Sequence, residues 1–91
     1  MAETQISERF RERDGIERTV LHEVVELHPE RVTIHELTLR IARDPEDEPM
    51  KEKIRHAARE LRRSGLVRFR DDDEVVEPTH TALRAFVLLT A

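Results

Sequence analysis

The sequence predicts a small, mainly helical domain in which three core helices lead into a β-hairpin and then a C-terminal helix. Three observations support this fold class. Apolar residues recur at helical spacing from Ile16 to Leu61. The stretch after Gly65 alternates between apolar and basic residues instead, as a strand does. With 91 residues, of which 37% are hydrophobic, the chain can build one thin core and hence one domain.

The first core helix is expected over about Ile16 to His28, where Pro29 closes the apolar pattern. One face of this segment is apolar and carries Ile16, Val20, Val24 and Leu27. Residues 1–14 are dense in charge and poor in large apolar groups. We therefore expect them to form an N-terminal arm or a short helix, and we place the domain itself at residues 15–91.

A second, shorter helix is expected to begin at Ile34. Thr33 and Glu36 have the spacing of a capping box, in which the threonine oxygen accepts a hydrogen bond from a free backbone N–H at the helix start. The pair Asp44 and Pro45 ends the pattern, since a residue before proline disfavours helical geometry. This helix has about three turns.

The third helix is expected over Pro49 to Ser64 and is strongly basic. The run from Met50 to Val67 has six basic residues against two acidic ones, a local charge of +4, whereas the chain has 16 basic and 20 acidic residues and a net charge of −4. Its inward face is predicted to carry Met50, Ile54, Ala57, Ala58 and Leu61. Its outward face is predicted to carry Glu52, Arg55, His56, Arg59 and Arg63.

A β-hairpin and a last helix complete the chain. Gly65 supplies a left-handed residue that ends the third helix. The hairpin strands are expected at Leu66 to Arg70 and from Val75 to Pro78, with a turn at Asp71 to Asp73. A final helix carries the apolar run Leu83 to Leu89 and begins at a threonine cap, for which the alternatives are Thr79 and Thr81.

This order of elements resembles the winged helix-turn-helix superfamily, particularly bacterial transcriptional regulators of the MarR, ArsR and PadR type. The carrying segments are Leu61 to Val67 and Val75 to Thr79, which look like the end of a recognition helix and the strands of a wing. The resemblance implies a three-helix core, a two-stranded wing and a C-terminal helix. It also implies DNA binding, with helix 49–64 entering the major groove.

Two departures from that family pattern stand out. Asp71 to Glu74 place four acids at the wing tip, where glycine or basic residues are common in DNA-binding members and where phosphate would be repelled. A glycine often follows the threonine after the second strand, and here the positions hold His80, Thr81 and Ala82. The first departure bears on wing contacts with DNA, and the second concerns only local capping.

The candidate DNA-binding residues are the basic groups of the third helix and the hairpin, together with one histidine: Lys51, Arg55, His56, Arg59, Arg62, Arg63, Arg68 and Arg70. Arginine on such a helix can contact phosphate and can pair bidentately with guanine. The alternative is a solvated face with ion pairs such as Glu52 to Arg55 or His56 to Glu60. Arg68 and Arg70 have their own alternative, since Glu74 and Glu77 can neutralise them across the hairpin.

Two function classes remain open. The first is a winged-helix DNA-binding protein that binds double-stranded DNA as a transcriptional regulator. The second is a winged-helix module that binds a protein partner through its acidic wing and basic face. The apolar run Leu83 to Leu89 has two interpretations as well, a homodimer interface or a helix face that packs on the first core helix.

Composition argues against other classes. The chain has no cysteine, which removes disulfides and thiolate chemistry, and its 14 arginines against 2 lysines suggest a high-GC bacterial genome. Its five histidines lack the spacing of a helical zinc site, and no nucleophile, base and orienting group can be assembled. We therefore expect no enzyme, no metal and no cofactor. The lack of a long apolar run or signal peptide favours a cytoplasmic protein without a membrane partner.

Overall fold

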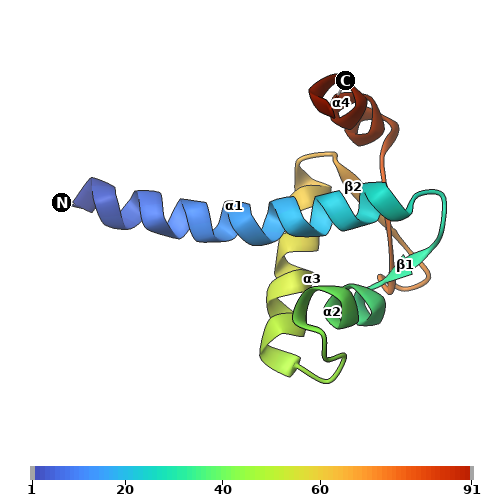
Figure 1. Ribbon diagram of the computed structural model, residues 1–91, viewed down its shortest axis with the longest axis horizontal. Coiled ribbons are helices and arrows are strands. Elements are labelled where there is room, and N and C mark those ends of the chain that lie inside the picture. Colours follow the sequence, from blue (N-terminus) through green and yellow to red (C-terminus); the bar gives the residue numbers. More distant parts are fainter. Residues whose placement is uncertain (1, 91) are drawn as a thin grey trace.

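The computed structural model describes the backbone of residues 2–90 and the side chains of residues 15–86. Over this range the fold is mainly helical with a small antiparallel sheet (Figure 1). The helices are α1 (Ala2–Leu27), α2 (Ile34–Ala42), α3 (Glu48–Arg63) and α4 (His80–Thr90). The strands are β1 (Val32–Thr33), β2 (Val67–Arg70) and β3 (Val75–Pro78), in the order β1-β3-β2.

Helix α1 is longer than the sequence pattern indicated. We expected a core helix at about Ile16 to His28 after an arm or short helix, whereas α1 runs without interruption from Ala2 to Leu27. Gly15 lies inside it. An internal glycine costs about 1 kcal/mol relative to alanine, which is too little to end a helix whose next turns are packed in the core. The side chains of residues 1–14 lie outside the described residues.

The hydrophobic core forms where α1 packs on α3 and α2 (Figure 1). Its fully buried members come from all three helices and include Val20, Val24, Leu37, Ile54 and Ala58. The inward face predicted for the third helix is confirmed, with Met50 partly buried at its edge. The small side chains of Ala57 and Ala58 let the backbone of α3 lie close to the neighbouring helices. Because this face of α3 is buried, the opposite face remains at the surface.

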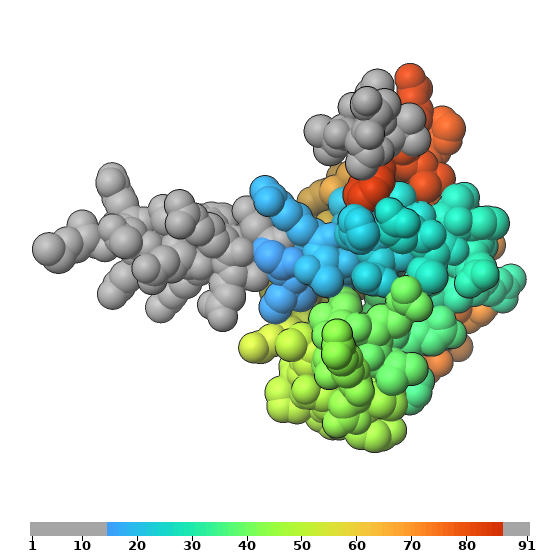
Figure 2. Space-filling view, in the orientation of Figure 1, coloured from blue at the N-terminus to red at the C-terminus, as the bar shows by residue number. Residues whose placement is uncertain are grey.

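An ion pair ties α1 to α2 at the surface. Arg40 Nε donates to Glu23 Oε2 at 2.7 Å, and this hydrogen bond, with the negative charge of Glu23, raises the pKa of Arg40 above its ordinary value. Figure 2 shows α1, in blue to cyan, and α2, in green, in contact along one face of the molecule. Since arginine is already charged at any physiological pH, the raised pKa of Arg40 leaves its charge unchanged there.

The start of α2 confirms one prediction and corrects another. The Thr33 hydroxyl oxygen accepts from the backbone N–H of Glu36 at 3.0 Å, as the capping pattern predicts. The predicted two-stranded wing was incomplete, because β1 pairs with β3 through Val32 and Val76 and makes a three-stranded sheet. A strand of two residues is too short to show an alternating pattern, so only its pairing partner reveals it.

The ends of α3 lie one residue away from their expected positions. Asp47 caps the helix by accepting from the backbone N–H of Met50 at 3.1 Å, so Pro49 is its second residue rather than its first. At the other end Gly65 has φ of 77°, as expected. The N–H of Leu66 then donates to the carbonyl of Leu61 at 2.9 Å. The backbone N–H of Leu66 thus belongs to the end of α3, and β2 begins at Val67, one residue later than expected.

Helix α4 follows β3 directly and is capped by Thr79, which decides between the two threonines. The Thr79 hydroxyl oxygen accepts from the N–H of Ala82 at 3.2 Å and donates to the carbonyl of Gly65 at 2.7 Å. Phe86 lies beside His22 of α1, with 5.5 Å between ring centroids. The rest of the apolar run, from residue 87, lies outside the described side chains.

Candidate nucleic-acid interface

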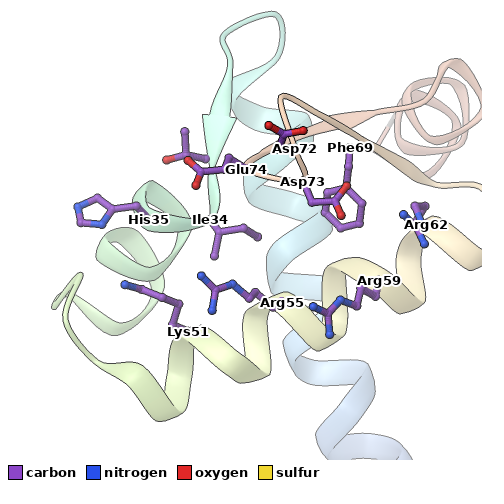
Figure 3. A pocket seen from close by; sticks show the side chains of 11 residues that line it. Ile34, His35, Lys51, Arg55, Arg59, Arg62, Phe69, Asp72, Asp73 and Glu74 are labelled. Atoms are coloured by element: carbon purple, nitrogen blue, oxygen red, sulfur yellow. The ribbon is translucent and has the colours of Figure 1, made fainter.

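A groove lies between α3 and the hairpin formed by β2 and β3, and its volume is about 670 Å³ (Figure 3). We call the residues that α3 contributes the cationic wall: Lys51, Arg55, Arg59 and Arg62. We call the residues opposite them the acidic wall: Asp72, Asp73 and Glu74. Phe69 of β2 lies between the walls, and the segment Thr33 to His35 lines one end.

Helical periodicity explains the cationic wall. The buried face of α3, from Ile54 to Leu61, is fixed against α1 and α2. Positions 51, 55, 59 and 62 then fall within about 80° of arc at 100° per residue, on the side of the helix that faces the hairpin. The side chains labelled on α3 in Figure 3 accordingly lie on one side of the groove, and the acidic residues lie on the other.

Most cations of this wall have a local partner. Lys51 Nζ lies 3.5 Å from Glu48 Oε1, and Arg55 Nη1 lies 3.0 Å from Glu52 Oε1, each one helical turn apart. The guanidinium carbon of Arg62 lies 5.3 Å from the centre of the Phe69 ring, a cation–π contact. Within the described side chains, Arg59 has no carboxylate within 4.0 Å. The pair of Arg55 with Glu52 is exposed and contributes only about 0.2–1 kcal/mol, so Arg55 remains available to a ligand, whereas the Lys51 side chain is only 13% exposed.

The acidic wall is carried by an unusual backbone. Asp71, Asp72 and Asp73 have φ of 51°, 57° and 66°, so three consecutive residues with side chains adopt the left-handed region. Asp71 accepts from the N–H of Glu74 at 3.2 Å, and Glu74 accepts from the N–H of Ile34 at 3.1 Å. These two bonds close the turn and attach it to the start of α2. From this turn Asp72, Asp73 and Glu74 line the groove on the side opposite α3.

The two walls face each other without touching. Among the side chains of residues 15–86, no carboxylate of the acidic wall lies within 4.0 Å of a cation of α3. Asp71 is the one carboxylate of the turn that does not line the groove, and its Oδ2 lies 3.4 Å from Nη1 of Arg31. The groove is thus open between a positive and a negative surface, and it has room for a ligand between them.

The structure gathers only half of the predicted site residues in this groove. Lys51, Arg55, Arg59 and Arg62 line it together. His56 and Arg63 are exposed on α3 away from the lining, and Arg63 pairs with Glu60 at 3.4 Å. The predicted stripe of Arg55, Arg59 and Arg63 is thus divided, because at 100° per residue position 63 lies about 40° beyond position 59 and outside the arc that lines the groove.

Arg68 and Arg70 lie on the outer face of β2 and do not line the groove. Both donate to the same oxygen of Glu77 on β3, at 3.3 Å and 2.8 Å. Of the two carboxylates that could neutralise these arginines, Glu77 is the one that does so. Alternation along β2 places Phe69 on the other side, facing Arg62. The sequence pattern indicated that alternation but not that the ring would contact α3.

Other kinds of site were sought over the same part of the chain. Within it, no group of three or more His, Cys, Asp or Glu side chains is arranged to hold a metal ion. None of the described helices is both long and apolar enough to cross a lipid bilayer. The groove is therefore the strongest candidate for a functional site.

Comparison with known proteins adds no assignment: no family model, no curated protein and no solved structure matches the chain.

Proposed function

We propose that the protein is a small winged-helix DNA-binding protein, a transcriptional regulator that inserts α3 into the major groove of double-stranded DNA. In this proposal α2 and α3 form the helix-turn-helix, and β2 and β3 form the wing. The observation that carries it is the cationic wall, in which four basic side chains on one face of α3 border an open groove. A helix about 10–12 Å across fits a major groove about 12 Å wide.

The arrangement of charge supports this use. Arg59 has no carboxylate partner among the described side chains, and the pairs of Lys51 and Arg55 are short-range contacts with exposed acids of the same helix. The exposed pair of Arg55 with Glu52 can exchange for phosphate at little cost. Arginine binds phosphate and guanine with two parallel hydrogen bonds, and this suits it to the role.

Binding to a labelled random-sequence duplex tests the proposal. We expect binding at about 50 mM salt that weakens markedly by about 200 mM, since cations that contact phosphate displace counterions. The decisive variant is Arg55→Ala with Arg59→Ala, and its matched control is Lys53→Ala with Arg63→Ala. Each double variant removes two positive charges and one ion pair within α3, either Arg55 with Glu52 or Arg63 with Glu60. Only the first double variant alters residues that line the groove.

The groove variant should bind the duplex roughly 10- to 100-fold more weakly than the unaltered protein, given about 1.5–3 kcal/mol for a hydrogen bond to a charged group. The control should lose only the few-fold expected of a change in net charge. Far-ultraviolet circular dichroism should show equal helicity in both. Absence of duplex binding at 50 mM salt would reject the proposal, and equal losses in the two variants would reject the groove as the contact surface.

A protein-binding module is the second candidate, and the acidic wall favours it. A groove with one positive and one negative surface suits a partner segment that carries both charges. Failure to retain DNA at low salt, together with binding of such a partner, would select this alternative.

The proposed homodimer through Leu83 to Leu89 is a separate matter. The contact of Phe86 with His22 places the middle of α4 against α1 within one chain, as the alternative interpretation expects. Sedimentation equilibrium tests the dimer directly, and a monomer at every accessible concentration would exclude it.

A further inference from the structure

We propose that the acidic wall is a repulsive selectivity element: Asp72 and Asp73 keep phosphate off the hairpin side of the groove and thereby suppress non-specific duplex binding. This inference rests on the proposed function, because it concerns how the same groove admits DNA. In this inference the turn does not attract DNA but discriminates between modes of DNA binding. Specificity is a difference of affinities, so a group that weakens the wrong mode of binding contributes to it.

The first step is that the wall keeps its charge. Asp71 lies outside the groove with Arg31 3.4 Å away, whereas Asp72 and Asp73 have no cation within 4.0 Å among the described side chains. Both line the groove opposite Arg55 and Arg59. A phosphate drawn in by the arginines therefore meets two carboxylates whose charge is not compensated nearby.

The second step is that repulsion acts across the width of the groove. Carboxylate and phosphate charges that face each other across a groove of this size lie within about one Debye length at low salt. At such separations each carboxylate lowers the affinity for phosphate by roughly two- to threefold in a medium close to water. A DNA backbone that runs over the hairpin is disfavoured, whereas one that follows α3 keeps its contacts with the cations.

The third step is that the fold of the turn does not require carboxylates. The left-handed conformation of residues 71–73 is adopted by asparagine at least as readily as by aspartate. No side-chain hydrogen bond of Asp72 or Asp73 closes the turn, which is held by backbone bonds at Asp71 and Glu74. Substitution by asparagine therefore removes charge and leaves shape in place.

The test compares Asp72→Asn with Asp73→Asn against a matched control, Asp71→Asn with Glu30→Gln. Each double variant removes two negative charges, and Asp71 and Glu30 are exposed positions that do not line the groove. Fluorescence anisotropy with a labelled random-sequence duplex measures the affinity at about 50 mM and about 200 mM salt. Thermal melts confirm that the variants are folded.

We expect the groove variant to bind roughly fourfold to ninefold more tightly than the unaltered protein at low salt, and the control to change less than about twofold. The difference should shrink at higher salt, because screening weakens the repulsion that was removed. Equal affinity in the two double variants would overturn it, as would weaker binding by the groove variant, which would show that the carboxylates accept hydrogen bonds from DNA.

Failure of the proposed function gives a different result. If neither the unaltered protein nor any variant binds duplex at low salt, DNA is not the ligand, and both the proposed function and this inference fall. If the unaltered protein binds and the variant does not bind more tightly, DNA binding stands and only the selectivity role is overturned.

Discussion

The two walls of the groove present opposite charges from opposite kinds of backbone. The cationic wall lies on α3, a 16-residue helix with an aspartate cap, a proline near its start and a glycine after its end. The acidic wall lies on a turn in which Asp71, Asp72 and Asp73 all have positive φ. The helix is anchored by a buried face, whereas the turn is anchored by backbone bonds at its two ends.

This difference separates two ways of placing charge. On α3 the burial of apolar residues determines which positions face the groove, so the cations keep their place as long as the core is intact. In the turn, local backbone conformation determines the direction of each carboxylate, and residues with a side chain pay about 1–2 kcal/mol in the left-handed region. The core should therefore control the first wall, and turn chemistry should control the second.

The largest effect is expected from the core beneath the cationic wall. Ile54 is fully buried in the core that α3 forms with α1 and α2, and Ile54→Ala should lower the free energy of unfolding by about 2–5 kcal/mol, since it removes buried methyl groups and leaves a cavity. Urea denaturation followed by circular dichroism measures this loss. Lys53→Ala, at the neighbouring exposed position, should change stability by no more than about 0.5 kcal/mol. A similar loss in both variants would contradict the assignment of the buried face.

A smaller effect is expected from backbone conformation at the two ends of β2. Gly65 has φ of 77° and an added Cβ would meet nothing within 4 Å, so Gly65→Ala should cost about 1 kcal/mol for backbone strain alone. Asp72→Gly should be more stable than Asp72→Asn by about 0.5–1 kcal/mol, because glycine relieves the left-handed strain and both variants lack the charge. Thermal unfolding measures both differences, and greater stability of the asparagine variant would show that the turn is unstrained.

The smallest effect is expected at the outer side of the turn. Arg31 and Asp71 are both exposed, with side chains 71% and 64% accessible, and their closest atoms are 3.4 Å apart. Arg31→Ala should change the free energy of unfolding by less than about 0.5 kcal/mol, since such surface pairs contribute little. Denaturant midpoints at low and high salt provide the measurement. A loss above 1 kcal/mol would mean that this pair, and not backbone bonding, holds the turn in place.

Much of the helical framework could be predicted because its signals are local. The cap at Thr33, the inward face of α3 and the left-handed Gly65 depend on neighbours a few residues away. The extension of α1 to Ala2 and the strand β1 were not predicted. The first has only a weak signal in charged residues with moderate helix propensity, and the second exists only because Val32 meets β3.

The candidate site was predicted in its composition but not in its grouping. The sequence indicated that the third helix is basic and that the turn is acidic. It could not tell that Arg62 belongs with Lys51, Arg55 and Arg59, or that Arg63 does not. A small change in how a helix is rotated against its core moves an edge residue from one face to another, and only packing sets that rotation.

By itself, the sequence determined that a basic, capped helix ends at a glycine and leads into a short hairpin with an acidic turn. Hydrogen bonding and periodicity within a few residues are sufficient for each of those features. Only the tertiary structure decided that the acidic turn faces the arginines across an open groove, and that Glu77 binds Arg68 and Arg70 instead. Those relations join residues far apart in the chain, and the packing of α1 on α3 and the pairing of β3 with both its neighbours establish them.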